Sequence, residues 1–401
     1  MRIEPERVYL YRRPVDSAVL PSAAYQDLAY AALSRLDLEL PADGTIAIKP
    51  NITIPAGPET RIVTHPGFVV GILRRLLDLG VPRERLVVME GYGRRQEGAR
   101  SGSGWHHPHP HRHRLHYQLH PEPQFHAPAH GPLPQASGYE AALGELGLPL
   151  TNHDECQEID VPVPGGVIFR QLRFPHHSAR AGLLLNVPVA KCHNLSCTTL
   201  CTKNLQGLVL SPQRHMCGIQ AEDEGVPAEE LARIGASGLS LHEERFCHKH
   251  ADLLAAVRHT GVPRLCVVDG LVGRDGTAFN EGRNHPLGWT VIGVNEVHVD
   301  AVATYLFGLD PEQTPYLRVA AQRGLGSNRV SDLEVVDLAT GQALAPHRLA
   351  ACRHQPALMP LCRYGDGYYA RFRADGSVVP WALDRVNQQR RADGLEPIPA
   401  C

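Results

Sequence analysis

Short apolar runs alternate with segments of helical periodicity along most of this chain, and this alternation limits the possible folds more than any other feature. Runs with the composition of buried strands lie at residues 8–11, 44–48, 85–89, 264–268 and 289–294. Segments with helical spacing lie at residues 23–36, 64–79, 139–146, 250–259, 297–307 and 315–323. Strands that alternate with helices form βαβ units, so the sequence predicts an α/β fold with a mostly parallel sheet flanked by helices.

The same pattern divides the chain into four parts. Residues 1–93 are expected to form a first α/β half. Residues 94–135 are a His-, Pro- and Gly-rich insertion without sustained periodicity, which predicts a flexible exposed loop. Residues 136–340 are expected to form a second α/β half that carries the main site, with edge strands at 159–161 and 167–169 and a further helix at 226–235. Residues 341–401 have weak periodicity and predict a C-terminal appendage.

Overall charge and hydropathy exclude several classes of partner. The net charge of -2 gives no reason to expect nucleic acid or an anionic membrane as a partner. No stretch approaches the roughly 18 uninterrupted apolar residues of a membrane span, and the N-terminus has mixed charges without an apolar signal core. We therefore expect a cytoplasmic protein, whose ten cysteines are thiols, metal ligands or core residues and do not form a disulfide framework.

Residues 186–209 concentrate reactive side chains directly after a buried apolar run. Two lysines, a histidine, three cysteines and several threonines and amides fall within this short stretch. Burying such groups costs free energy unless each finds a partner, so a segment needed only for packing would not collect them. This stretch is the first candidate for a functional site.

The cysteines of this stretch allow two interpretations. If residues 194–206 are helical, His193, Cys197 and Cys201 recur every four residues and share one face, with Cys192 beside them. Thiolates and imidazole suit iron, an iron–sulfur cluster or another transition metal, although the spacing matches neither a ferredoxin run nor a common zinc site. Alternatively, the cysteines are small apolar residues that allow close packing against the sheet.

The lysines point to an anion. Lys49, Lys191 and Lys203 each follow or flank a buried strand, where an ammonium without a partner is costly. Asn51 and Asn204 add an amide beside two of them. The negative charge could come from Glu90, Asp269 and Asp300 as structural ion pairs, or from a bound carboxylate or phosphate. The Gly-rich residues 269–276 predict a turn that brings Asp269 toward a ligand, and they do not match a dinucleotide or Walker fingerprint.

Several ordered motifs also resemble a known family. The resemblance rests on residues 48–51, 63–66, 88–91, 185–191, 199–207, 267–270 and 299–303. In this order they are similar to the bacterial and archaeal family called the domain of unknown function three-six-two, over residues 46–336 apart from the insertion. Many members carry ferredoxin-type iron–sulfur segments, which implies redox chemistry or cluster handling, but this chain has no Cys-x2-Cys-x2-Cys run. The positions that recur in the family fall on Lys49, Asn51, Lys191, Lys203, Asn204, Asp269 and Asp300.

Three hypotheses follow from these observations. The leading one is an enzyme for a small anionic substrate, held by Lys49, Lys191 and Lys203 with Asn51 and Asn204. His193 would then be the general base and Asp269 and Asp300 would orient lysines or move protons. In a metal variant, Cys192, His193, Cys197 and Cys201 bind iron or another transition metal and the reaction uses a redox partner.

The other two hypotheses come from different classes. In one, the protein handles copper, nickel or zinc through the cysteines and the nine histidines between residues 106 and 130, although these histidines also fit a solvated loop. In the other, the protein is an anion-binding module without catalysis.

Overall fold

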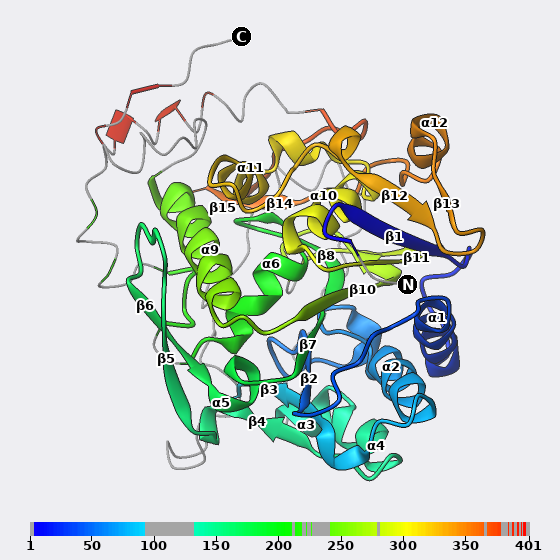
Figure 1. Cartoon of the computed structure of the whole chain (residues 1–401). Helices are drawn as coiled ribbons and strands as arrows, with labels where there is room; N and C mark the ends of the chain where they lie inside the picture. The colour runs from blue at the N-terminus through cyan, green and yellow to red at the C-terminus, as the bar shows by residue number, and fades with distance from the viewer. Residues whose placement is uncertain are drawn as a thin grey trace.

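A computed structural model of the chain forms the basis of the description that follows (Figure 1). The structure describes residues 4–92, 132–210, 213–218, 222, 226, 241–278, 281–364, 367–377, 384, 387–388, 391–392, 394 and 396–397. The expected helix at 226–235 and almost all of the His-rich insertion at 94–135 therefore lie outside the described residues.

One large mixed sheet runs through the molecule. Its strands are β1 (Arg7–Arg12), β2 (Ile46–Pro50), β3 (Leu86–Glu90), β4 (Leu150–Asn152), β7 (Leu183–Val187), β8 (Val189–His193), β9 (Cys197–Thr199), β10 (Arg264–Arg274), β11 (Asn284–Gly293), β12 (Glu334–Asp337) and β13 (Gln342–Ala343). The strand order is β13-β12-β1-β11-β10-β7-β2-β3-β4, with β8 paired to β10 and β9 to β8. The pairs β10·β7, β7·β2, β2·β3 and β3·β4 are parallel, while β11 is antiparallel to both of its neighbours. The predicted mostly parallel α/β fold is confirmed.

Helices cover both faces of this sheet. They are α1 (Ser22–Ser34), α2 (Pro66–Asp78), α3 (Leu133–Ala136), α4 (Tyr139–Gly144), α5 (His176–Ala179), α6 (Cys201–Asn204), α9 (Leu241–His259), α10 (Glu296–Leu306), α11 (Pro315–Gln322) and α12 (Pro346–Ala350). Figure 1 shows α1, α2 and α4 together on one side, with α9 and α11 on the other. Single 3-10 turns lie at Pro58–Thr60, Arg83–Arg85, His153–Glu155, Leu205–Leu208, Pro311–Gln313 and Val330–Asp332.

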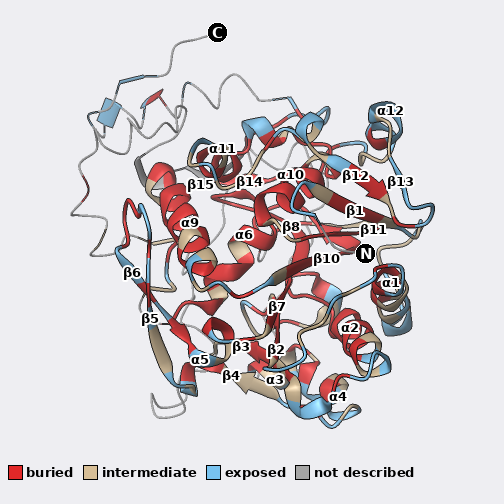
Figure 2. Ribbon diagram, viewed as in Figure 1, coloured by how far each residue is buried: buried red, intermediate tan, exposed pale blue. Residues whose placement is uncertain are grey.

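Strand alternation decides which core each residue joins. Ile46 and Ile48 of β2 pack in the cluster that includes α1 and α2, whereas Ala47 between them packs with α9 and α11. Successive side chains on a strand point to opposite faces, so a central strand needs apolar residues at every position. This explains why these strands appear in the sequence as continuous apolar runs, and Figure 2 shows them buried.

Some segments differ from the sequence-based expectation. The second edge strand lies at Gln171–Pro175 (β6), paired antiparallel with β5 (Glu158–Pro162), so the prediction of a strand at 167–169 was wrong. The backbone N–H groups of residues 167–169 instead donate to the Asp252 carboxylate of α9. A carboxylate thus satisfies these donors in place of a strand partner.

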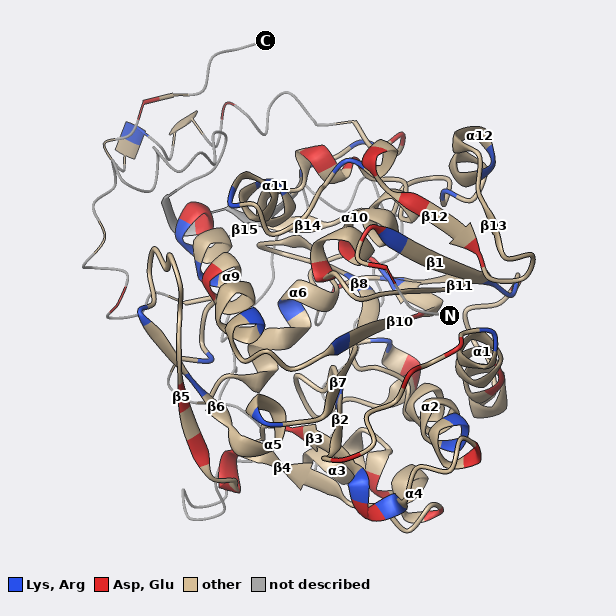
Figure 3. Ribbon diagram, in the orientation of Figure 1, with Lys and Arg blue, Asp and Glu red and all other residues tan. Residues whose placement is uncertain are grey.

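The chain after residue 341 contacts the main body. β13 pairs with β12 at the edge of the sheet, and β14 (Leu361–Tyr364) forms a two-stranded sheet with β15 (Gly367–Ala370). Leu358 and Phe372 are fully buried in the cluster that contains Trp289 of β11. Both charge signs are distributed over the outer helices and loops (Figure 3). Within the described part of the chain, no helix is long and apolar enough to cross a membrane.

Candidate functional site

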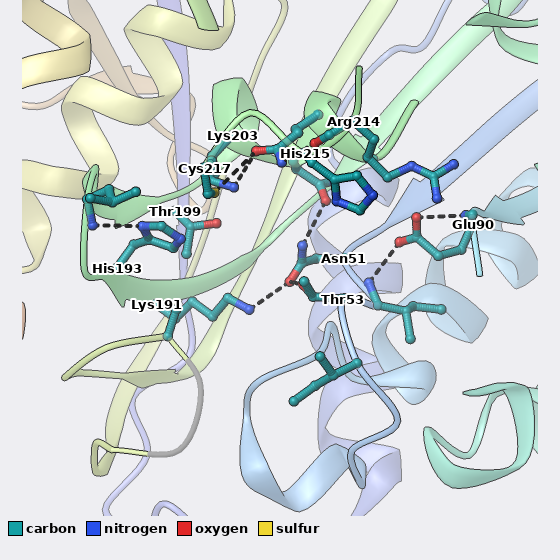
Figure 4. Close-up of a pocket in the computed structure, with 18 of the residues that line it drawn as sticks. Asn51, Thr53, Glu90, Lys191, His193, Thr199, Lys203, Arg214, His215 and Cys217 are labelled. Atoms are coloured by element: carbon teal, nitrogen blue, oxygen red, sulfur yellow. Dashed lines mark hydrogen bonds between the residues drawn. The ribbon is translucent and has the colours of Figure 1, made fainter. Parts of the chain in front are cut away.

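A cavity of about 140 Å³ opens where β2 and β3 end, beside the β8–β9 hairpin and α6 (Figure 4). Six of the sequence-predicted site residues line it: Lys49, Asn51, Lys191, His193, Lys203 and Asn204. A volume of roughly 10–15 Å³ on this measure admits one water, so the cavity has room for a small organic molecule. Its place at the carboxyl ends of parallel strands is where α/β sheets bind ligands.

Lys49 at the end of β2 is neutralised by Glu90 at the end of β3. Its Nζ lies 2.7 Å from Glu90 Oε2, and both side chains are almost completely buried. Glu90 also accepts from the backbone N–H groups of Ile52 and Gly91, each at 2.9 Å. Burial lowers the Lys49 pKa, and the neighbouring Glu90 carboxylate raises it. For Lys49, the negative charge therefore comes from a structural ion pair and not from a bound anion.

Gly207 packs directly against this ion pair. A Cβ at Gly207 would lie 2.7 Å from Lys49 Nζ and 3.0 Å from Glu90 Oε1. Real Cβ atoms essentially never approach other heavy atoms below 3.0 Å, so a side chain at this position would force the Lys49 ammonium to shift within the pair.

A chain of amides connects Lys191 to Asn204. Lys191 Nζ donates to Asn51 Oδ1 at 2.9 Å, and Asn51 Nδ2 donates to Asn204 Oδ1 at 3.2 Å. Asn204 Nδ2 in turn donates to the Lys49 carbonyl at 3.0 Å and to Asn186 Oδ1 at 2.8 Å. Lys191 also donates to the carbonyl of Ile62. Its hydrogen bonds to Asn51 and Ile62 therefore go to neutral acceptors, in contrast to the carboxylate beside Lys49.

Burial and neighbouring positive charges together destabilise the ammonium form of Lys191 relative to its neutral amine. The pKa of Lys191 is lowered well below its ordinary value, first by burial and then by the positive charges of Lys203, Arg274 and Arg61. Both causes disfavour the charged form of an amine.

His193 lies on the same face of β8 as Lys191, because the two residues are two positions apart on a strand. Its Nδ1 accepts from the backbone N–H groups of Leu195 at 3.0 Å and Ser196 at 3.3 Å. Burial and the charges of Lys203 and Lys191 lower the His193 pKa well below its ordinary value. The ring is therefore neutral near pH 7, and because Nδ1 accepts, its proton lies on Nε2. This tautomer makes Nε2 a hydrogen-bond donor.

Lys203 of α6 completes the cationic side of the cavity. Its Nζ donates to Gln206 Oε1 and lies 5.8 Å from the centroid of the Phe246 ring. Gln206 Oε1, which as an amide oxygen can only accept, also lies 3.2 Å from His250 Nε2. Among the described residues, Lys203 thus contacts an amide and an aromatic ring, neither of which carries a negative charge.

Arg214 contributes a further cation that the sequence-based prediction missed. Its guanidinium pairs with Asp154, with Nη1 3.0 Å from Oδ2, and contacts His153 Nε2 at 3.3 Å. His215 and Cys217, which follow the cysteine-rich stretch by a short loop but were not among the predicted site residues, also line the cavity. These residues lie in an irregular segment after α6, where no strand or helix signal could indicate them.

Asp269 and Asp300 do not line the cavity. The prediction that Asp269 follows a strand was wrong, because β10 continues through Asp269 to Arg274 and pairs there with β11. Asp269 Oδ2 instead accepts from Arg61 Nη2 at 2.6 Å and from the backbone N–H of His65 at 2.9 Å. Burial raises its pKa, although the Arg61 charge opposes that shift.

Asp300 stabilises the start of α6, the helix that carries two of the cavity residues. It projects from α10 and accepts from the backbone N–H groups of Cys201 at 2.7 Å and Thr202 at 2.9 Å, at the start of α6. Burial raises its pKa to about 6. Asp300 therefore positions the helix that carries Lys203 and Asn204 without contacting the cavity itself.

The four candidate metal ligands are not brought together. Residues 189–193 and 197–199 form a β-hairpin, so the helix required for His193, Cys197 and Cys201 to share a face does not form. Cys192 points away from the His193 side into an apolar cluster, as strand alternation requires. Cys197 Sγ lies 3.9 Å from Cys362 Sγ, and among the described residues no three His, Cys, Asp or Glu side chains form a metal-holding group.

Comparison with known proteins identifies a family for this chain. No curated protein matches the sequence. A solved crystal structure of a Thermotoga maritima protein is similar at 8% identity and a TM-score of 0.35, and the alignment covers 80% of this chain. This chain spans 61% of the length of that protein. The family model described as domain of unknown function (DUF362) matches residues 46–305, which include every strand that borders the cavity, and the chain therefore belongs to the DUF362 family.

Proposed function

We propose that the protein is an enzyme that acts on a small carboxylate- or phosphate-bearing substrate in this cavity. One observation carries the proposal: Lys191, His193 and Lys203 line a single cavity in which the described carboxylate, Glu90, is already bound to Lys49. A bound anion would supply a negative charge beside Lys203.

The charge balance supports an anion over a neutral ligand. Lys49, Lys191, Lys203 and Arg214 line the cavity, and of these Lys49 pairs with Glu90 and Arg214 pairs with Asp154. The described contacts of Lys203 are an amide and an aromatic ring, and this side of the cavity is buried enough to lower the pKa of Lys191. Electrostatic attraction is strongest in such low-dielectric surroundings, so an anion would bind on this side.

His193 suits a donor role better than the general base suggested by its residue type alone. Its neutral ring carries the proton on Nε2, because Nδ1 already accepts two backbone N–H groups. A neutral imidazole donor can stabilise negative charge that develops on a substrate oxygen. The aspartates take a positioning role, since Asp300 holds α6 and Asp269 holds the loop at residues 61–65.

Thermal unfolding with and without inorganic phosphate or acetate tests the anion site. An anion at 100 times its dissociation constant should stabilise the folded chain by about 2.7 kcal/mol. Lys203→Met keeps most of the side-chain volume beside Phe246 but removes the charge, so its stabilisation by anions should fall by most of that amount. Lys203→Arg restores the charge and should restore much of the effect.

Arg329→Met provides a matched control. Arg329 is 64% exposed and pairs with Glu312, and neither residue lines the cavity, so its loss should leave anion stabilisation unchanged. Equal stabilisation of wild type and Lys203→Met by every anion would show that the cavity is not the anion site.

A further inference from the structure

We propose that Cys197 and Cys362 form a redox pair, which a peroxide converts to a disulfide that ties β14 to the β8–β9 hairpin. Neither cysteine lines the cavity, so the redox pair is independent of the proposed anion site.

The two thiols lie in contact inside the fold, although they are 165 positions apart in the sequence. Cys197 Sγ is 3.9 Å from Cys362 Sγ, and each residue is at most 1% exposed. Cys197 begins β9, and Cys362 lies in β14. The sulfur atoms of a disulfide are about 2.0 Å apart. Bond formation therefore brings together two side chains that already touch, because the fold has placed the remote segments side by side.

The backbone at Cys197 costs free energy that packing of a small apolar residue does not explain. Its φ is 65°, in the left-handed region that glycine enters without strain and other residues disfavour. Strained positions of this kind concentrate at functional sites. A glycine at this position would relieve the strain but would remove the thiol, so the cysteine is best explained by a use for its sulfur.

The surroundings favour Cys197 as the thiol that reacts first. Its pKa is lowered, chiefly because the Cys362 thiol can donate a hydrogen bond to the Cys197 thiolate; burial opposes this effect and the Arg371 charge adds to it. The same contact, together with burial, raises the pKa of Cys362 well above its ordinary value. The thiolate is the nucleophile in cysteine oxidation, so Cys197 attacks the oxidant and Cys362 then resolves the product.

The reaction balances with one molecule of hydrogen peroxide. The Cys197 thiolate attacks one peroxide oxygen and the O–O bond breaks, which gives a sulfenic acid and a hydroxide that takes up the proton lost by Cys197. The Cys362 sulfur then attacks the sulfenic sulfur, so the S–S bond forms as the S–O bond breaks. The hydroxide that leaves takes up the Cys362 proton. The two thiols lose two electrons, the peroxide gains them, and the products are one disulfide and two water molecules.

Burial restricts the oxidant to a small molecule. Because both thiols are enclosed, an oxidant reaches them through local opening of the structure, which admits a molecule close to the size of water more readily than a bulky one. β14 belongs to a two-stranded sheet with β15 and not to the main sheet. A two-stranded sheet is only marginally stable by itself, so we expect the opening to occur on this side of the pair.

A disulfide at this position would connect two segments that border the candidate site. Cys197 is the cross-strand partner of His193, which lines the cavity. The Leu361 N–H, next to the second cysteine, donates to the Gly276 carbonyl at 3.0 Å, and Ala278 two residues further on lines the cavity. The bond would therefore join the hairpin to the turn that follows β10.

Peptide mapping under non-reducing conditions tests the pair. The full-length protein is treated with hydrogen peroxide, unfolded in N-ethylmaleimide and digested with trypsin for mass spectrometry. We expect peptide 192–203 cross-linked to peptide 354–363, and dithiothreitol should separate them. Oxidised glutathione should form the link far more slowly, because it is too large to reach the buried thiols. Equal rates with the two oxidants would overturn the assignment of a peroxide.

Peptide 192–203 contains three cysteines, so matched variants identify the one that reacts. Cys197→Ser should abolish the link, whereas Cys192→Ser, in the same buried cluster, should retain it. If a variant folds poorly, fragmentation of the wild-type cross-linked peptide locates the bridge. A link that persists in Cys197→Ser would overturn the proposal, as would a wild-type peptide 354–363 that is recovered only as the N-ethylmaleimide adduct.

Urea unfolding measures the connection between the two segments. The disulfide closes the long loop between positions 197 and 362, so the oxidised protein should unfold at a higher urea concentration than the reduced protein. Cys362→Ser treated with peroxide should show no such increase. An unchanged or lower midpoint after the disulfide has formed would contradict a bond that ties β14 to the hairpin.

Discussion

Replacement of Glu90 by glutamine should strongly destabilise the protein, because it leaves Lys49 without its counterion. The carboxylate accepts from Lys49 Nζ at 2.7 Å and from two backbone N–H groups at 2.9 Å, and both members of the pair are less than one-tenth exposed. Removing one partner of a buried ion pair costs about 3–5 kcal/mol, since the other charge stays buried. We therefore expect Glu90→Gln to lose about 3–5 kcal/mol at neutral pH.

The pH dependence of this variant gives a second signature. The Lys49 pKa is already lowered by burial, and Glu90 is the group that opposes that shift. Without Glu90, the folded state binds a proton at Lys49 less readily than the unfolded state does. Stability should therefore rise with pH up to the unfolded value of about 10.4, by at most about 1.4 kcal/mol per pH unit.

Urea unfolding followed by circular dichroism measures the effect, and two further variants control it. Lys49→Met combined with Glu90→Gln also removes the buried ammonium that the single variant leaves without a counterion. The amide oxygen at position 90 still accepts a backbone N–H, so the double variant should regain most of the lost stability. Glu312→Gln breaks the exposed pair with Arg329 and should cost no more than about 1 kcal/mol. A Glu90→Gln variant as stable as Glu312→Gln, with no recovery in the double variant, would refute the argument.

Two further predictions follow from His65 and Cys217. Burial lowers the His65 pKa to about 3, and its Nδ1 accepts from the Gly67 N–H at the start of α2, so stability should fall as pH drops below the unfolded value of about 6.5. His65→Asn keeps a cap acceptor, and between pH 7 and 4.5 it should lose about 2–3 kcal/mol less than wild type in urea unfolding; an equal loss would contradict this origin. Cys217 lines the cavity whereas Cys352 does not, so phosphate should slow alkylation of Cys217 by iodoacetamide and leave Cys352 unaffected. Equal protection of both thiols would place the anion elsewhere.

The lysine positions show which features of the cavity the local sequence pattern can predict. Lys49 and Asn51 lie at the end of a buried strand in the sequence, and the structure brings both to the cavity at that end of the sheet. Lys191 and Lys203 reach the same cavity from β8 and α6. The burial argument needed only that polar groups beside core strands require partners, which holds whichever tertiary partner each one finds.

The aspartates and cysteines show what the local sequence pattern cannot predict, namely the strand pairing that decides where their side chains lie. Asp269 was expected in a turn because glycines follow it, but pairing with β11 extends the strand through those glycines. A glycine-containing segment allows either a turn or a strand, and a cross-strand partner distant in sequence decides between them. The hairpin at residues 189–199 likewise replaced the expected helix, which separated Cys192 from His193.

The sequence by itself determined the α/β class and indicated most of the lysines and amides that line the candidate site, because apolar periodicity and the cost of buried charge are local properties. Tertiary structure decided how those groups pair. It pairs Glu90 with Lys49 and Asp154 with Arg214, brings the Asn51 amide to Lys191, and directs two backbone N–H groups to Nδ1 of His193. The physical reason is that pKa and reactivity depend on the charges and acceptors within a few ångströms of a group, and in this cavity those neighbours come from segments far apart in the chain.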